Sequence, residues 1–154
     1  MDKILSGLVL INNVDIWKKY GAFLTESRAG GRDNMKALLK PSKTKAHIGV
    51  DIREENGTKY SRELKIANVE REVTLHFALI ANTPDEWYEN YRNFMDFIKK
   101  GNKGWLTLML PKMGFTFDFF YLDSTSFEPL TTLWQVGKQA SRFKIKFKEP
   151  HPVI

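Results

Sequence analysis

The sequence predicts a β-dominated α+β domain in which antiparallel sheets pack together, as a β-sandwich or split barrel, with one helix on their flank. Several segments alternate apolar and polar side chains with a period of two, as half-buried strands do. One segment, at about 84–100, has helical spacing and a signal at each end. With 154 residues and 42% hydrophobic content, the chain fits a single domain over residues 1–154.

The predicted helix is defined by residues at both of its ends. Thr83 and Glu86 form a capping box at the start, and Gly101 follows the last turn as a common helix stop. Between them an aromatic stripe recurs at a spacing of three and four residues: Trp87, Tyr91, Phe94 and Ile98. We assign this stripe to the core, because so many aromatic rings on one face need cover.

Ahead of the helix, the chain predicts two hairpins and one long strand. A short hairpin covers 8–11 and 14–17 around an Asn-Asn turn, and 22–25 is a further short strand. The segments 46–53 and 60–66 flank Asn56-Gly57, the strongest hairpin signal in the chain. Segment 70–81 alternates cleanly and is the longest predicted strand.

After the helix, the chain predicts an aromatic hairpin and a final strand. The hairpin pairs 105–110 with 115–122, and the second of these segments is apolar on both faces. Such a strand is normally covered twice, here by the helix and by a sheet or a neighbouring subunit. A short strand is expected at 133–136, and the last strand at 140–148.

The positive charge is concentrated in a segment that predicts a long loop, at about 28–45. This segment has six basic residues and one acid, and so contributes +5 of the formal net charge of +6. It is too long for a common connection and too polar for a core element. Loops of this kind are either mobile or functional, and the sequence leaves both open.

A second basic feature lies on the outer face of the last predicted strand: Arg142, Lys144, Lys146 and Lys148. Three interpretations are open. Lysines guard edge strands against aggregation, a row of positive charge binds phosphates, and a basic surface fits an acidic face of an identical neighbour.

The sequence contains no pattern that indicates an enzyme. It has no cysteine, which excludes disulfides and thiolate chemistry, and its three histidines lie far apart. Phosphate loops, dinucleotide motifs and nucleophile elbows are absent from it. We therefore predict no catalytic residue, cofactor, metal or small-molecule substrate, although an enzyme of unrecognised type remains an alternative. No apolar run is long enough to span a membrane, so we predict no membrane-spanning segment.

Four parts of the chain occur in an order seen in one family: LVLINNVDIWKKYGAFLTE; the long loop after it; REVTLHFALIANT running into TPDEWYENYRNFMDFIKKG; and WLTLMLPKMGFTFDFFYLD with FKIKFKEP as the final strand. In this layout the chain resembles the tail-tube and distal-tail superfamily of long-tailed phages. The resemblance implies packed antiparallel sheets with a flanking helix, and a non-enzymatic structural protein of a phage or prophage tail, in a distal-tail, baseplate-hub or tail-tube position.

The resemblance also implies the partners. Subunits of this family form homohexameric rings through sheet edges and loops, and the rings stack with other tail proteins in a virion tail assembled in the bacterial cytoplasm. The matching contacts here are expected in the long loop: Arg28, Arg32, Lys36, Leu38, Leu39 and Lys43. Removing residues 35–41 is then expected to leave a folded monomer that does not assemble. No carbohydrate-binding module is expected, since the sequence ends at Ile154.

Two further considerations bear on this expectation. A lone helix does not cover every apolar strand face, so leftover surface independently favours association between copies. The alternative function is a nucleic-acid-binding module without sequence specificity, using the loop 28–45 and the basic face of the last strand.

Overall fold

The computed structural model describes residues 2–26, 28–132 and 134–154. A seven-stranded antiparallel sheet has the order β2-β1-β7-β8-β9-β6-β3, and β4 pairs with β5 apart from it. The strands are β1 (Leu10–Ile11), β2 (Val14–Asp15), β3 (Ala22–Leu24), β4 (Val50–Asp51), β5 (Thr58–Lys59), β6 (Arg71–Ala81), β7 (Trp105–Leu110), β8 (Phe115–Pro129) and β9 (Gln139–Glu149). The helices are α1 (Asp2–Leu5), α2 (Ile16–Tyr20), α3 (Asp33–Leu39) and α4 (Pro84–Lys100). The predicted β-dominated α+β class is confirmed.

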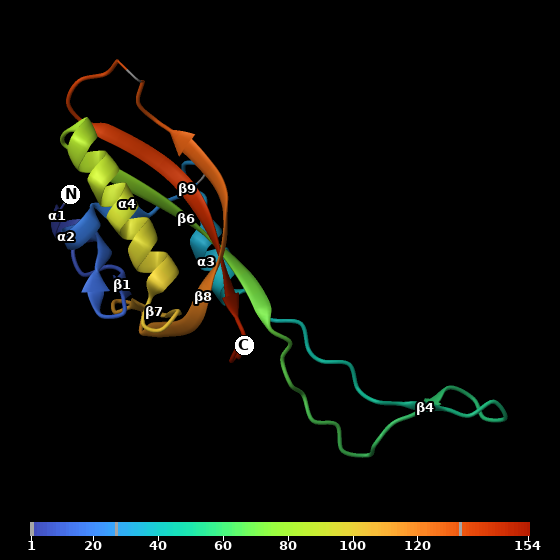
Figure 1. The fold of residues 1–154 in the computed structure, drawn as a ribbon. Helices are drawn as coiled ribbons and strands as arrows, with labels where there is room; N and C mark the ends of the chain where they lie inside the picture. The colour runs from blue at the N-terminus through green and yellow to red at the C-terminus, as the bar shows by residue number, and fades with distance from the viewer. Residues whose placement is uncertain (1, 27, 133) are drawn as a thin grey trace.

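Helix α4 forms where the sequence predicts it and lies across one face of the sheet (Figure 1). The Thr83 hydroxyl accepts a hydrogen bond from the Glu86 N–H at 3.1 Å, which is the expected cap. Gly101 ends the helix with a φ of 50°, a value that favours glycine. Phe94 and Ile98 are the buried residues of the helix, while Trp87 and Tyr91 are only half-buried.

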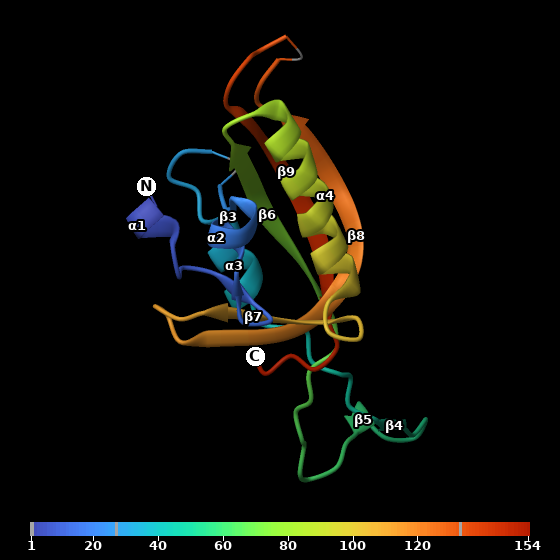
Figure 2. The same ribbon diagram turned by 60° about the vertical axis from the view of Figure 1, so that its left-hand side comes forward.

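Strand β8 connects the two halves of the sheet. Its first part, from Phe115 to Phe120, pairs with β7, and the part from Phe120 to Pro129 pairs with β9. Register shifts at 121–123 and at 124–126 interrupt the ladder with β9. Such irregularities bend a strand, and in Figure 2 β8 turns from the direction of β7 to that of β9. The sheet therefore curls over its own core.

Aromatic rings from four elements form one part of the core, beside many buried aliphatic side chains. Phe77 of β6 meets Phe94 of α4 edge-on with ring centroids 5.5 Å apart, and stacks on Phe143 of β9 at 5.9 Å. Phe119 of β8 stacks on Phe147 of β9 at 4.4 Å. Offset and edge-on geometries of this kind are favourable beyond the area that they bury. The helix and both halves of the sheet are thus joined through aromatic contacts.

Some of the shorter predicted strands are found with changed bounds, and the one expected at 133–136 is not found among the described residues. The first hairpin is reduced to β1 and β2, and the φ angles of Asn12 and Asn13 are 51° and 66°, as a two-residue hairpin turn requires. Of the strand expected at 133–136, Leu133 lies outside the described residues and Trp134 to Val136 are not in a strand.

The prediction of a continuous loop at 28–45 is corrected by α3, which packs against β6. Leu38 is completely buried. The Asn34 side chain takes the place of a neighbouring strand: its Oδ1 accepts the His76 N–H at 2.7 Å, and its Nδ2 donates to the Thr25 and His76 carbonyls at 2.7 and 3.2 Å. Helix α3 therefore covers part of the β6 edge beyond the three residues that β3 pairs.

This packing predicts different effects for two substitutions on the same short helix. Leu38→Ala is expected to lower the free energy of unfolding by about 2–5 kcal/mol, because it leaves a cavity under α3. The exposed Lys36→Ala is the matched control and should change it by no more than about 0.5 kcal/mol. Urea denaturation measures both. Equal values would contradict a packed α3. Because Leu38 is packed against β6, removing residues 35–41 is expected to damage the fold and not to leave a folded monomer.

Candidate functional site

The most exposed part of the molecule is residues 46–66, which we call the arm. It extends away from the body and contains the separate pair β4 and β5 (Figure 1). Every arm residue except the half-buried Ile52 is exposed. Within the arm the backbone closes tightly: a Cβ on Gly49 would lie 2.7 Å from Thr58 Cγ2 and 2.8 Å from the Tyr60 ring. Of the predicted hairpin around Asn56-Gly57 only two residues on each side pair, Val50 with Lys59 and Asp51 with Thr58, and this pair lies outside the main sheet. The strand expected at 60–66 is wrong, because none of these residues is in a strand.

The arm presents five apolar side chains that the described chain leaves more than half exposed. They are Ile48, Val50, Tyr60, Leu64 and Ile66. Ile48 is 92% exposed and Ile66 is 75% exposed. A single exposed apolar residue is ordinary, but several on one projecting hairpin indicate a contact surface.

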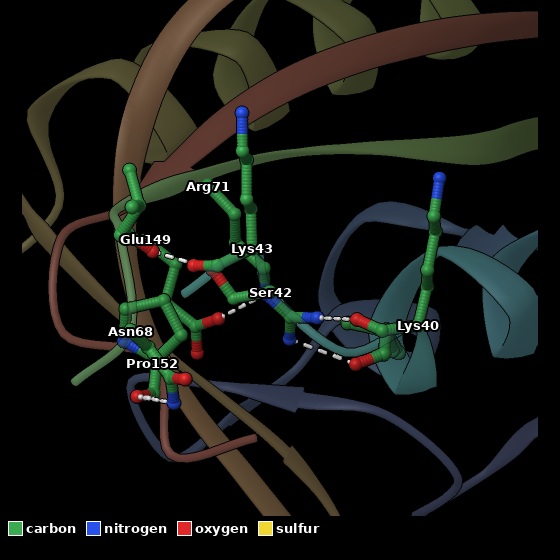
Figure 3. A network of polar contacts seen from close by, with 9 residues as sticks. Lys40, Ser42, Lys43, Asn68, Arg71, Glu149 and Pro152 are labelled. Atoms are coloured by element: carbon green, nitrogen blue, oxygen red, sulfur yellow. Dashed lines mark hydrogen bonds and ion pairs between the residues drawn. The ribbon is translucent and has the colours of Figure 1, made fainter. Parts of the chain in front are cut away.

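The base of the arm is held by backbone pairing. The Lys45 N–H donates to the Ala67 carbonyl and the Val69 N–H to the Lys43 carbonyl, both at 2.7 Å. The Asn68 side-chain amide donates to the Pro152 carbonyl at 3.0 Å, which joins the base to the C-terminal residues (Figure 3).

Beside this base lies a nearly buried ion pair between β6 and β9. Arg71 Nε donates to Glu149 Oε1 at 2.5 Å, and the side chains are 10% and 6% exposed. The other guanidinium nitrogens donate to the carbonyls of Leu38 and Lys40 at the end of α3 (Figure 3). A planar guanidinium with several donors suits such a junction. Arg71 therefore ties β6, β9 and the end of α3 together beside the base of the arm.

The structure leaves exposed five of the six interface residues predicted in the basic segment: Arg28, Arg32, Lys36, Leu39 and Lys43. They are spread before, along and after α3. The prediction for Leu38 is corrected, because that side chain is fully buried against β6 and is not accessible to a neighbour. The apolar arm residues were assigned to ordinary sheet strands because they flank the Asn56-Gly57 turn, so their exposure was missed.

The basic face of β9 is largely paired within the chain. Three of its four predicted residues lie close to carboxylates: Arg142 to Glu128 at 2.9 Å, Lys146 to Glu72 at 3.6 Å and Lys148 to Glu70 at 3.3 Å. Lys144 is the β9 residue in register with His76 of β6. Each pair is partly exposed and contributes little to stability, but together they reduce the positive potential of this face.

Strand β8 has one long edge without a strand partner among the described residues. From Tyr121 to Pro129 it pairs with β9 on one side, while β7 pairs only with its first half. Residues 122–130 are all exposed. The terminal strands of the sheet are much shorter, with two residues in β2 and three in β3. An open edge of this length is a template for a strand from another chain.

An apolar groove adjoins the end of that edge and encloses about 380 Å³. Its walls come from the start of α4, the end of β8 and the start of β9: Pro84, Trp87, Phe127, Pro129, Thr131, Thr132, Gln139, Ala140 and Ser141. We call it the Trp87–Phe127 groove.

Aromatic contacts shape the Trp87–Phe127 groove. The Trp87 ring stacks on Tyr91 at 5.2 Å and its Nε1 donates to Ser141 Oγ at 3.2 Å, so its orientation is fixed. Phe127 meets both rings edge-on and is still 47% exposed. No ionisable side chain lines the groove. It suits an apolar occupant.

Little in the described residues suggests catalysis. No group of three His, Asp or Glu side chains there is arranged to hold a metal. In the part of the chain that the structure describes, no helix is both long enough and apolar enough to cross a membrane. A small polar hollow of about 140 Å³ lies against β6, β8 and β9 and includes His76, Ser126 and Lys144.

Burial lowers the pKa of His76 below its ordinary value of 6.5. The carboxylates of Asp33 and Glu26 act in the opposite direction, and the positive charges of Lys144 and Arg142 lower the pKa further. The neutral imidazole is therefore the form that the fold favours.

In comparisons with protein-family models, curated proteins and solved structures, no match was found.

The lowered pKa of His76 predicts a pH dependence of stability. Below pH 6.5 the unfolded chain takes up the proton more readily than the folded chain, so the free energy of unfolding should fall as the pH decreases towards the folded-state pKa. His76→Gln should remove this component. Urea denaturation of both proteins between about pH 5 and 7.5 measures it, and a difference between them that does not vary with pH would contradict the assignment.

Proposed function

We propose that this chain is a non-enzymatic structural protein of a phage or prophage tail, of the distal-tail, baseplate-hub or tail-tube type, that assembles with copies of itself into a ring. The observation that carries the proposal is the arm, whose apolar side chains project from the body without cover. The unpaired edge of β8 supports it as a second contact surface. The function is geometric: repeated identical contacts close a ring, and rings stack with other tail proteins.

The energetics favour more than one contact for each subunit. Burying a large apolar side chain contributes roughly 1.5–3 kcal/mol, so the five arm residues, already partly covered, supply on the order of 10 kcal/mol. Association costs about 4–15 kcal/mol in lost freedom of motion. The arm alone therefore gives weak association. Pairing at the β8 edge, together with the closure of a ring, makes the assembly stable.

The sequence resemblance agrees with this layout. Two of the parts on which the resemblance rests correspond to neighbouring elements of the structure. The first is β6 running directly into α4, and the second, the aromatic hairpin, is β7 with the first half of β8. The hexameric ring, the virion tail as its location and the assembly in the bacterial cytoplasm come from that resemblance. They are part of the proposal.

No specific observation favours the nucleic-acid alternative. Three of the four basic residues on β9 already face carboxylates of this chain. The other predicted basic residues, such as Arg28, Arg32 and Lys36, are exposed and lie before and along the short helix α3.

Removing the arm tests the proposal without disturbing the core. Because Lys45 and Ala67 are hydrogen-bonded, an Asn-Gly turn can replace residues 46–66 between them. The shortened chain should keep its thermal unfolding midpoint, and light scattering should show a monomer at concentrations where the full chain is oligomeric. A control with three polar arm positions changed (R53S, R62S and K65S) should still assemble, whereas I48S, L64S and I66S together should not. Oligomers of the shortened chain would refute the role of the arm.

The β8 edge is tested by placing a charge on it. Ser126→Lys puts an ammonium group on the regular stretch of the unpaired half of the strand, where a paired neighbour would have to bury it, so smaller oligomers are expected. Thr116→Lys is the matched control, since Thr116 is exposed in the half of β8 that β7 already pairs. Analytical ultracentrifugation compares the two. The same reduction in both variants would argue against edge pairing.

A further inference from the structure

We infer that the arm of one copy docks in the Trp87–Phe127 groove of another copy, in a head-to-tail contact. This inference rests on the proposed self-assembly and names the surface that receives the arm. It is drawn from where the arm and the groove lie, from the side chains that each presents and from the strand edge between the two copies.

The groove is out of reach of the arm of the same chain. The arm begins next to Arg71, at one end of β6, and the groove lies by α4, which follows the other end of β6 at Ala81. Eleven residues of extended strand separate these ends, a distance of about 35 Å. The arm points away from the body at the end opposite the start of α4 (Figures 1 and 2). Its apolar side chains and the groove therefore meet only between copies.

The two surfaces match in chemistry. The groove has aromatic, proline and small polar side chains and no charge, and its volume is within the range of ordinary binding pockets. The arm supplies aliphatic side chains from both of its limbs, such as Ile48 and Leu64, with charged residues between them. An apolar centre in a pocket and a charged rim is the usual anatomy of an interface. Aromatic residues such as Trp87 and Phe127 are enriched in the cores of interfaces, and tryptophan is a frequent anchor of such contacts.

The β8 edge explains how an arm strand would be held there. Phe127 lies in the unpaired half of β8 and also lines the groove. An extended limb of the arm seated in the groove therefore runs beside open N–H and C=O groups. Strand addition to a sheet edge, with side chains in an adjoining pocket, is an established mode of recognition.

The contact is heterologous, because the arm and the groove are different surfaces at opposite ends of the body. An open chain of copies then has one free arm at one end and one free groove at the other until a ring closes, and it continues to grow as a stack if the rotation does not close.

Cross-linking tests this contact directly, because the chain has no cysteine of its own. Ile48→Cys labels the arm, Thr132→Cys labels the rim of the groove, and Lys112→Cys in the exposed β7–β8 turn is the control. Equal mixtures are treated with a short bismaleimide. The arm and groove variants should give a covalent dimer, their double variant a ladder of multimers, and the arm and turn variants at most a trace. Adding Phe127→Ser to the groove variant should weaken association about tenfold or more.

The outcomes separate this inference from the proposed function. Oligomers in light scattering without selective arm-to-groove cross-linking would overturn the docking site and leave self-assembly standing. A chain that is monomeric at every concentration would overturn both.

Discussion

The ladder between β6 and β9 is the constraint on which the rest of the structure depends. It pairs eleven residues without interruption, from Arg71 opposite Glu149 to Ala81 opposite Gln139. One face of the ladder carries the phenylalanines that meet α4, and the other carries charged side chains. Because the ladder is continuous, it also separates its two ends by the length of eleven paired residues. The arm leaves beside the first pair, and the Trp87–Phe127 groove is built around the last.

The bend in β8 closes the core and leaves part of the strand without a partner on one side. By passing from β7 to β9, this strand closes the curled sheet over Phe119 and gives the domain its core. The half of β8 that leaves β7 loses its partner on that side. A single helix on one face and α3 at the β6 edge do not restore it. The incomplete edge therefore follows from the way in which the core is closed.

Local signals in the sequence explain which elements could be predicted. The bounds of helix α4 could be predicted to within one residue, because Thr83 caps its start and Gly101 ends it through contacts with residues close in sequence. Helix α3 was missed because it depends on Asn34 and Leu38 meeting β6, a contact that no spacing reveals. The turn at Asn56-Gly57 was predicted, but whether its strands join the sheet is decided by distant parts of the chain. The groove combines three elements and has no sequence signature, although Trp87 was recognised as part of a stripe.

The irregularity of the β8 edge bears on how selective the proposed contact is. Natural edges are often blunted by bulges and prolines, which prevent indiscriminate pairing. Here two register shifts interrupt the edge before Ser126, and Pro129 ends it. Only a short regular stretch, Ser126 to Pro129, remains, and it lies against the groove. A stray strand gains few hydrogen bonds on so short a stretch, whereas an arm that also fills the groove gains apolar burial at the same place. Because stable pairing needs both the hydrogen bonds at the edge and the apolar burial in the groove, it favours copies of this chain over other partners.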